Sequence, residues 1–146
     1  MNTVVTGQEY FMRAWIQPEA DRLARLIHGS ILTPQEAHHE LRVTARRHAS
    51  RGKLKLDADR FADRMLVDEW HRQEEAHAAT FTQLSQLAVQ ILNRGGTLDG
   101  ARLAIGDAAL DCPLPPPEAL LEQALHHATV EHRRRISWQR KREAMA

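Results

Sequence analysis

The feature that most constrains this chain is an uninterrupted helical pattern in its middle. Asp57 or Asp59 can cap the start of the pattern, and no glycine or proline follows until Gly95 and Gly96. Apolar residues recur within it at the helical period of about 3.6, and the two residue types that most often interrupt a helix are missing. About 36 residues at 1.5 Å each would make a helix roughly 54 Å long. The sequence therefore predicts one long central helix over about residues 58–93.

The apolar residues of this long helix do not all fall on one face. Projection at about 100° per residue gives one broad face for most of its length. That face consists of Leu66, Trp70, Gln73, His77, Thr80, Phe81, Leu84, Leu87, Ala88 and Ile91. Phe61 and Met65 lie about 100° or more from its centre. Either the helix bends near its middle, or its first turns pack against a different neighbour.

Two helices are expected before the long one. The first covers about residues 8–28, and Pro18 is expected to start a second segment or to kink it, because proline removes a backbone donor and clashes with the preceding turn. The second begins after Thr33, where threonine caps, a proline takes the first helical position and Glu36 can reach back to the cap amide. This second helix is expected to end near Ser50.

Two further helices are expected after the long one. A short helix covers about residues 98–110, residues 111–116 form a proline-rich connector, and a long basic helix covers about residues 117–143. No stretch alternates with the period of a β-strand. The chain is therefore expected to be an all-α, single-domain bundle of four to five helices over residues 1–146, with residues 1–7 flexible.

Composition indicates a globular protein and excludes several classes. The chain has 146 residues, of which 42% are hydrophobic and 27% charged, enough for one domain with a core. No apolar run approaches the roughly 20 residues of a membrane span, and the N-terminal residues lack the features of a signal peptide. Cys112 is the single cysteine, which fits a reducing compartment. We therefore expect a cytoplasmic protein without membrane contact and without a cofactor.

The net charge of +1 conceals a segregated charge distribution. Residues 41–56 carry six arginines and lysines and no acid, whereas residues 57–78 carry seven acids against three arginines. The C-terminal run is basic again. Such segregation either guides a charged partner or lets neighbouring helices attract each other.

The C-terminal run contains six basic side chains in residues 133–142, together with Trp138. On a helical projection an apolar stripe continues from Leu121 to Ile136, and four basic residues face away from it. A row of guanidinium groups on one helix face suits contacts with phosphate oxygens. Trp138 lies at the edge of the stripe, where core or interface packing is favoured over stacking on a base. The alternative is a solvated helix end whose positive charges favour the macrodipole.

These patterns favour a non-catalytic accessory protein that associates with nucleic acid, for example as a subunit of a nucleoprotein assembly. The four outward-facing residues would contact the phosphate backbone, helped by arginines of the second helix if that helix presents the same surface. The candidate residues are Arg133, Arg134, Arg140 and Lys141, with Arg42, Arg46, Arg47 and Arg51. An alternative is a protein-interaction or homo-oligomerisation module that uses the acidic face of residues 57–78.

A second alternative centres on Glu74 and His77, which are three residues apart and hence neighbours on a helix. The pair resembles in part the Glu-x-x-His motif of ferritin-like di-iron bundles, a resemblance that implies a metal site. The last helix offers His127 and Glu131 instead, a spacing that departs from the second copy of that motif. The simpler interpretation is a histidine at the edge of the core, satisfied by Glu74 or by a backbone carbonyl.

Arg72 and His77 match the Arg-x-x-x-x-His pattern of HEPN ribonucleases, which are also small helical bundles. This resemblance implies RNA cleavage, in which the histidine would act on a ribose hydroxyl or a leaving group and the arginine would steady the phosphate. On one straight helix, however, Arg72 projects about 140° away from His77.

Overall fold

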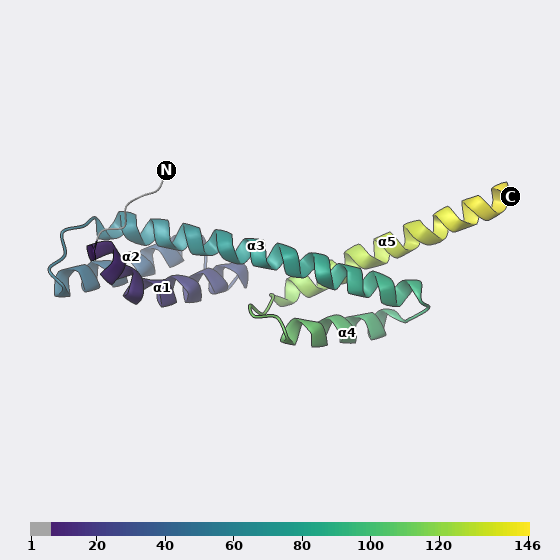
Figure 1. Ribbon diagram of the computed structural model, residues 1–146, viewed down its shortest axis with the longest axis horizontal. Helices are drawn as coiled ribbons and strands as arrows, with labels where there is room; N and C mark the ends of the chain where they lie inside the picture. Colours follow the sequence, from purple (N-terminus) through teal and green to yellow (C-terminus); the bar gives the residue numbers. More distant parts are fainter. Residues whose placement is uncertain (1–6) are drawn as a thin grey trace. The chain divides into compact units, whose positions relative to one another are not determined.

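The computed structural model describes residues 7–146 and consists there of helices alone (Figure 1). The five helices are α1 (Gly7–His28), α2 (Pro34–Arg51), α3 (Ala58–Asn93), α4 (Leu98–Leu110) and α5 (Glu118–Met145). The protein is therefore an all-α bundle, as the helical periodicity predicts. The segment expected to be flexible falls on residues 1–6, outside the described residues, except for Gly7, which begins α1. Within residues 7–146, no helix is long and apolar enough to cross a membrane.

The helix ends follow local signals in the sequence. At the start of α2, the Thr33 hydroxyl accepts a hydrogen bond from the Glu36 amide at 3.2 Å, and the Glu36 carboxylate accepts one from the Thr33 amide at 3.2 Å. This reciprocal pair is the predicted capping box. At the end of α3, Gly95 has a φ of +86°, a left-handed conformation that glycine adopts without strain. Helix α1, in contrast, continues through Pro18 as a single element, so no second segment begins there.

The first compact unit, unit 1, extends to Glu74 and contains α1, α2 and the first half of α3. Helices α1 and α2 are antiparallel, because Gln8 of α1 accepts a hydrogen bond from Lys55 just after α2, while Arg22 pairs with Glu40 near the start of α2. Side chains from all three helices form one core. Its largest fully buried members are Met12, Ile16, Leu23, Leu41 and Leu66.

The second compact unit, unit 2, covers Glu75–Ala146 and contains the second half of α3, α4 and α5. Its core is built from a few large apolar side chains separated by alanines, which allow close approach of the helices. The buried residues are Leu84, Ala88, Leu92, Ala101, Ile105, Ala109, Ala124, Leu125 and Ala128.

Helix α3 packs against different neighbours along its length. Phe61, Met65 and Leu66 belong to the core of unit 1, whereas Leu84 and Ala88 belong to the core of unit 2. Leu66 projects onto the broad face, so the core of unit 1 takes in both this face and the side of α3 that carries Phe61 and Met65. Of the two expectations for this helix, packing of its first turns against a different neighbour is therefore confirmed. The expectation that residues 1–146 form one domain stays a prediction.

Substitution of Ile105 tests the core of unit 2. Its side chain is 1% exposed, so Ile105→Ala is expected to lower the free energy of unfolding by about 2–5 kcal/mol in urea titrations followed by circular dichroism. Leu103, on the same helix, is 72% exposed, and Leu103→Ala is expected to change that free energy by less than about 0.5 kcal/mol. Equal losses for the two variants would contradict the packing of α4.

Candidate nucleic-acid interface

Helix α5 leaves the core of unit 2 after His132. Leu125 and Ala128 are buried, and His132 makes the last hydrogen bond to another helix within residues 7–146, with its Nδ1 2.8 Å from Oδ1 of Asn93. Beyond this point Ile136 is half-buried and every other residue is exposed. In Figure 1 these turns form the end of α5 that is coloured towards yellow. The predicted apolar stripe therefore loses its neighbours about one turn before Ile136.

The four C-terminal candidate residues all lie on this exposed part of α5. Arg133, Arg140 and Lys141 have no ion pair within residues 7–146. Arg134 pairs with Glu131 at 3.2 Å, but its side chain remains mostly exposed, and such surface pairs contribute little stability. Within residues 7–146, most of the positive charge of this helix end is therefore not paired with a carboxylate.

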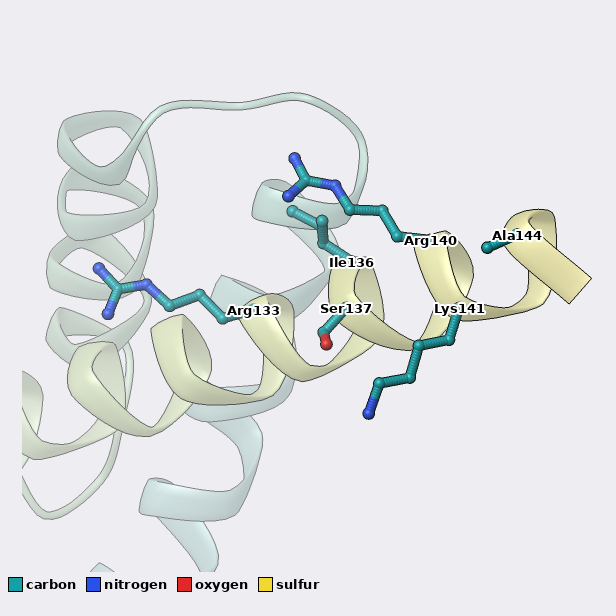
Figure 2. Close-up of a pocket in the computed structure, with 6 residues that line it drawn as sticks. All are labelled: Arg133, Ile136, Ser137, Arg140, Lys141 and Ala144. Atoms are coloured by element: carbon teal, nitrogen blue, oxygen red, sulfur yellow. The ribbon is translucent and has the colours of Figure 1, made fainter.

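Three of these residues line one shallow groove along α5 (Figure 2). Arg133 and Arg140 are seven residues apart, which separates them by about 10.5 Å along the helix axis. Ile136 and Ser137 lie between them, and the side chains of Arg140 and Lys141 diverge to opposite sides of the helix in this view. The groove therefore presents several cations along a short apolar strip.

Trp138 does not pack into the core, and the expectation of core packing is wrong. Its side chain is 63% exposed, because α5 has already left the other helices of unit 2 when this residue is reached. Packing against a partner stays a prediction. A signal in the sequence for this exposure is that Ile136 is the only large aliphatic side chain between Val130 and Met145.

The candidate residues of α2 have different surroundings. Arg42 holds the carboxylate of Asp63 with two hydrogen bonds, from Nε at 2.8 Å and from Nη2 at 2.7 Å. Arg46 holds Asp59 in the same two-pronged way, with both distances at 2.6 Å. The basic and acidic segments around the turn before α3 therefore pair inside unit 1, which is one of the two interpretations that the charge segregation allows.

These pairs change the acidity of the carboxyl groups. The hydrogen bonds from Arg42 lower the pKa of Asp63 against the opposing effect of its partial burial, and His38, 2.9 Å from the same carboxylate, lowers the pKa further. The hydrogen bonds from Arg46 likewise lower the pKa of Asp59. Both carboxylates therefore favour the charged form in the folded protein.

Arg47 and Arg51 are exposed and have no ion pair within residues 7–146. They belong to unit 1, whereas the C-terminal candidates belong to unit 2. A surface shared by α2 and α5 therefore stays a prediction, and within α2 only Arg47 and Arg51 retain charges that no described carboxylate balances.

Some acids of the acidic face of residues 57–78 are also paired with other side chains of unit 1. Glu69 is buried and contacts Arg72, while Gln17 donates a hydrogen bond to it at 2.6 Å. Burial opposes ionisation of Glu69, but hydrogen bonding with Arg72, Asp21 and Gln73, together with the charge of Arg72, outweighs it and the pKa is lowered. Of the acids on this face, Asp59, Asp63 and Glu69 thus have internal partners.

The two residues at the centre of the metal hypothesis differ in exposure, and the ribonuclease hypothesis stays a prediction. Glu74 is exposed and pairs with His71 at 3.7 Å, whereas His77 is buried. The ring of His127 packs on Phe81, with centroids 5.7 Å apart. Within residues 7–146, no group of three or more histidine, cysteine, aspartate or glutamate side chains is arranged to hold a metal ion.

Comparison of the chain with protein-family models, with curated proteins and with solved structures gave no match.

The pair of Arg42 and Asp63 predicts a specific dependence of stability on pH. Because the folded-state pKa of Asp63 is lowered, its contribution is fully present above the unfolded pKa, near 4, and is lost as the pH falls through the folded value. Arg42→Gln is therefore expected to lower the free energy of unfolding at pH 7 and to have a much smaller effect at about pH 2. Urea titrations at both pH values measure this difference.

Arg47→Gln is the matched control, because this neighbouring arginine has no described carboxylate partner. It is expected to leave the dependence of stability on pH unchanged. A loss of stability in Arg42→Gln that is the same at both pH values would contradict a role through the ionised carboxylate.

Proposed function

We propose that this protein is a non-catalytic accessory protein that binds the phosphate backbone of nucleic acid through the basic segment of α5, residues 133–142. The observation that carries the proposal is that these basic side chains are exposed and that few of them form ion pairs. The segment holds six basic side chains and no acid, it is exposed apart from half-buried Ile136, and within residues 7–146 only Arg134 of the four candidates has an ion pair.

The contrast with α2 supports the choice of helix. Arg42 and Arg46 have their donors directed to carboxylates of α3, so a phosphate would have to displace an existing two-pronged partner. Arg133 and Arg140 have no such partner in the described residues. Binding to them requires only the release of water and counterions.

The macrodipole of α5 does not account for the whole basic segment. Positive side chains gain from the dipole within about the last turn of a helix. Arg142 meets this condition, since α5 ends at Met145. Arg133 and Arg134 lie about three turns before that end. The macrodipole therefore does not explain these two charges, whereas binding of a polyanionic partner would explain them.

Contacts of this kind position a nucleic-acid backbone without reading its sequence. Each contacted phosphate releases condensed counterions, so the affinity falls as salt is added. The expected behaviour is salt-dependent binding with little preference for base composition.

The dependence of affinity on salt tests the proposal. The fourfold variant Arg133→Gln, Arg134→Gln, Arg140→Gln and Lys141→Gln is expected to reduce the slope of log affinity against log salt by about 3, since each phosphate contact contributes about 0.7–0.9. Fluorescence anisotropy with labelled DNA and RNA, between about 50 and 200 mM salt, measures the slope. Circular dichroism of the same variant checks that the helices remain.

The double variant Arg42→Gln and Arg46→Gln is the matched control, because these charges are already paired inside unit 1. It is expected to keep the wild-type slope. Tight binding that ignores both salt and the fourfold substitution would overturn the proposal.

Self-association is a second candidate function, and one observation favours it. Tyr10, Phe11 and Trp15 are exposed within about two turns of α1. Phe11 and Trp15 are four residues apart and hence neighbours on the helix surface, and Tyr10 lies about 100° round the helix from Phe11. Together they expose more apolar surface than the singly scattered residues of most monomers. We propose a second copy of this chain as the occupant of this aromatic face. This choice differs from the acidic face of residues 57–78, whose acids are partly paired internally.

Light scattering over a range of protein concentrations tests self-association. The wild-type mass is expected to rise towards that of a dimer, and Tyr10→Ser combined with Phe11→Ser is expected to restore the monomer mass. Leu103→Ser, a substitution of another exposed apolar residue in unit 2, serves as the control and is expected to leave the dimer intact. A wild-type protein that stays monomeric at every concentration would rule this candidate out.

A further inference from the structure

Trp138 differs from the other two tryptophans of the chain in its surroundings. The ring of Trp15 stacks on His48, and that of Trp70 stacks on His28, each with centroids 5.3 Å apart. Trp138 has no ring partner within residues 7–146 and is 63% exposed. A large aromatic surface is thus left in contact with water, where its burial by a ligand would be favourable.

The neighbours of Trp138 on α5 are cationic on both sides. Side chains three and four residues apart are adjacent on a helix surface. Those positions around Trp138 are occupied by Arg134, Arg135, Lys141 and Arg142. The exposed indole therefore lies between two basic turns, one before it and one after it. No acid occurs between Glu131 and Glu143 to compete with an anionic ligand.

A row of cations alone would serve a duplex or a single strand equally well, because both present phosphates. An exposed indole adds a flat surface on which a base can stack, and only unpaired bases offer an open face. In a duplex the faces of the bases are already covered by their neighbours. The combination of stacking surface and flanking cations is the arrangement that single-strand binding uses.

We propose that the nucleic acid bound by the basic segment is single-stranded, and that one unpaired base stacks on the indole of Trp138. Arg134 and Lys141, two of the four candidate residues, then contact the phosphates on either side of that base, together with Arg135 and Arg142, which flank Trp138 on the same face of α5. This inference rests on the proposed function, since it specifies which class of nucleic acid the same helix end receives. It also gives Trp138 a role that its position outside the core leaves open.

Binding of the full chain to oligothymidine and to a duplex of the same length tests the inference. Wild-type protein is expected to bind the single strand more tightly at the same salt concentration. Trp138→Ala is expected to weaken single-strand binding by about 5- to 150-fold, the usual effect of losing one stacked base, and to leave duplex binding nearly unchanged. Trp138→Phe is expected to retain part of the affinity, because phenylalanine keeps a smaller stacking surface.

Tryptophan fluorescence gives an independent readout of stacking. Oligothymidine is expected to quench the wild-type emission, and the quenching is expected to disappear in Trp138→Phe although Trp15 and Trp70 remain. Leu103→Ala removes another exposed apolar side chain of unit 2 and is expected to change neither affinity nor quenching.

The outcomes separate this inference from the proposed function. Salt-dependent binding of both nucleic acids with equal affinity, unchanged in Trp138→Ala, would overturn the single-strand inference and leave phosphate binding in place. Absence of salt-dependent binding to either nucleic acid would overturn the proposed function and this inference with it. Loss of single-strand and duplex binding to the same degree in Trp138→Ala would assign the residue a role in holding the helix end, and would also overturn the inference.

Discussion

Burial of apolar side chains along both halves of α3 is the constraint on which the rest of the structure depends. Leu66 completes the core beneath α1 and α2, and Leu84 completes the core beneath α4 and α5. Neither helical pair could bury its apolar stripe without a third helix, because an amphipathic helix gains most of its stability from packing. Because α3 contains no glycine or proline, it forms one continuous helix. Its first half serves as the third helix of unit 1, and its second half serves as the third helix of unit 2.

The partition of charge between paired and unpaired arginines follows from the same packing. Where α2 lies against α3, Arg42 and Arg46 meet carboxylates at hydrogen-bonding distance. Where α5 runs beyond the core of unit 2, Arg133 and Arg140 have no ion pair within the described residues. Similar runs of basic residues therefore have different surroundings: Arg42 and Arg46 are paired with carboxylates, whereas Arg133 and Arg140 have no ion pair within the described residues. The net charge of the chain, which is close to zero, reveals neither the paired nor the unpaired arginines.

Local structure could be predicted from the sequence, whereas tertiary pairing could not. Neighbouring residues encode the capping box of Thr33 and Glu36 and the end of α3 at Gly95. These helix ends could therefore be predicted from the sequence. The partner of Arg42 depends on which face of α3 lies opposite, and a helical projection contains no such information. The projection favours core or interface packing for Trp138 because it extends the apolar stripe along the whole helix, although the core of unit 2 ends before this residue.

The exposed end of α5 also has a consequence for how that helix forms. An isolated helix of about a dozen residues is marginal in water, because the first turn fixes several residues for a single hydrogen bond. The turns of α5 that hold Leu125 and Ala128 are already fixed by the core. They act as the nucleus from which the basic segment propagates, one hydrogen bond per residue. The helical order of the exposed turns therefore depends on turns that are packed in the core of unit 2.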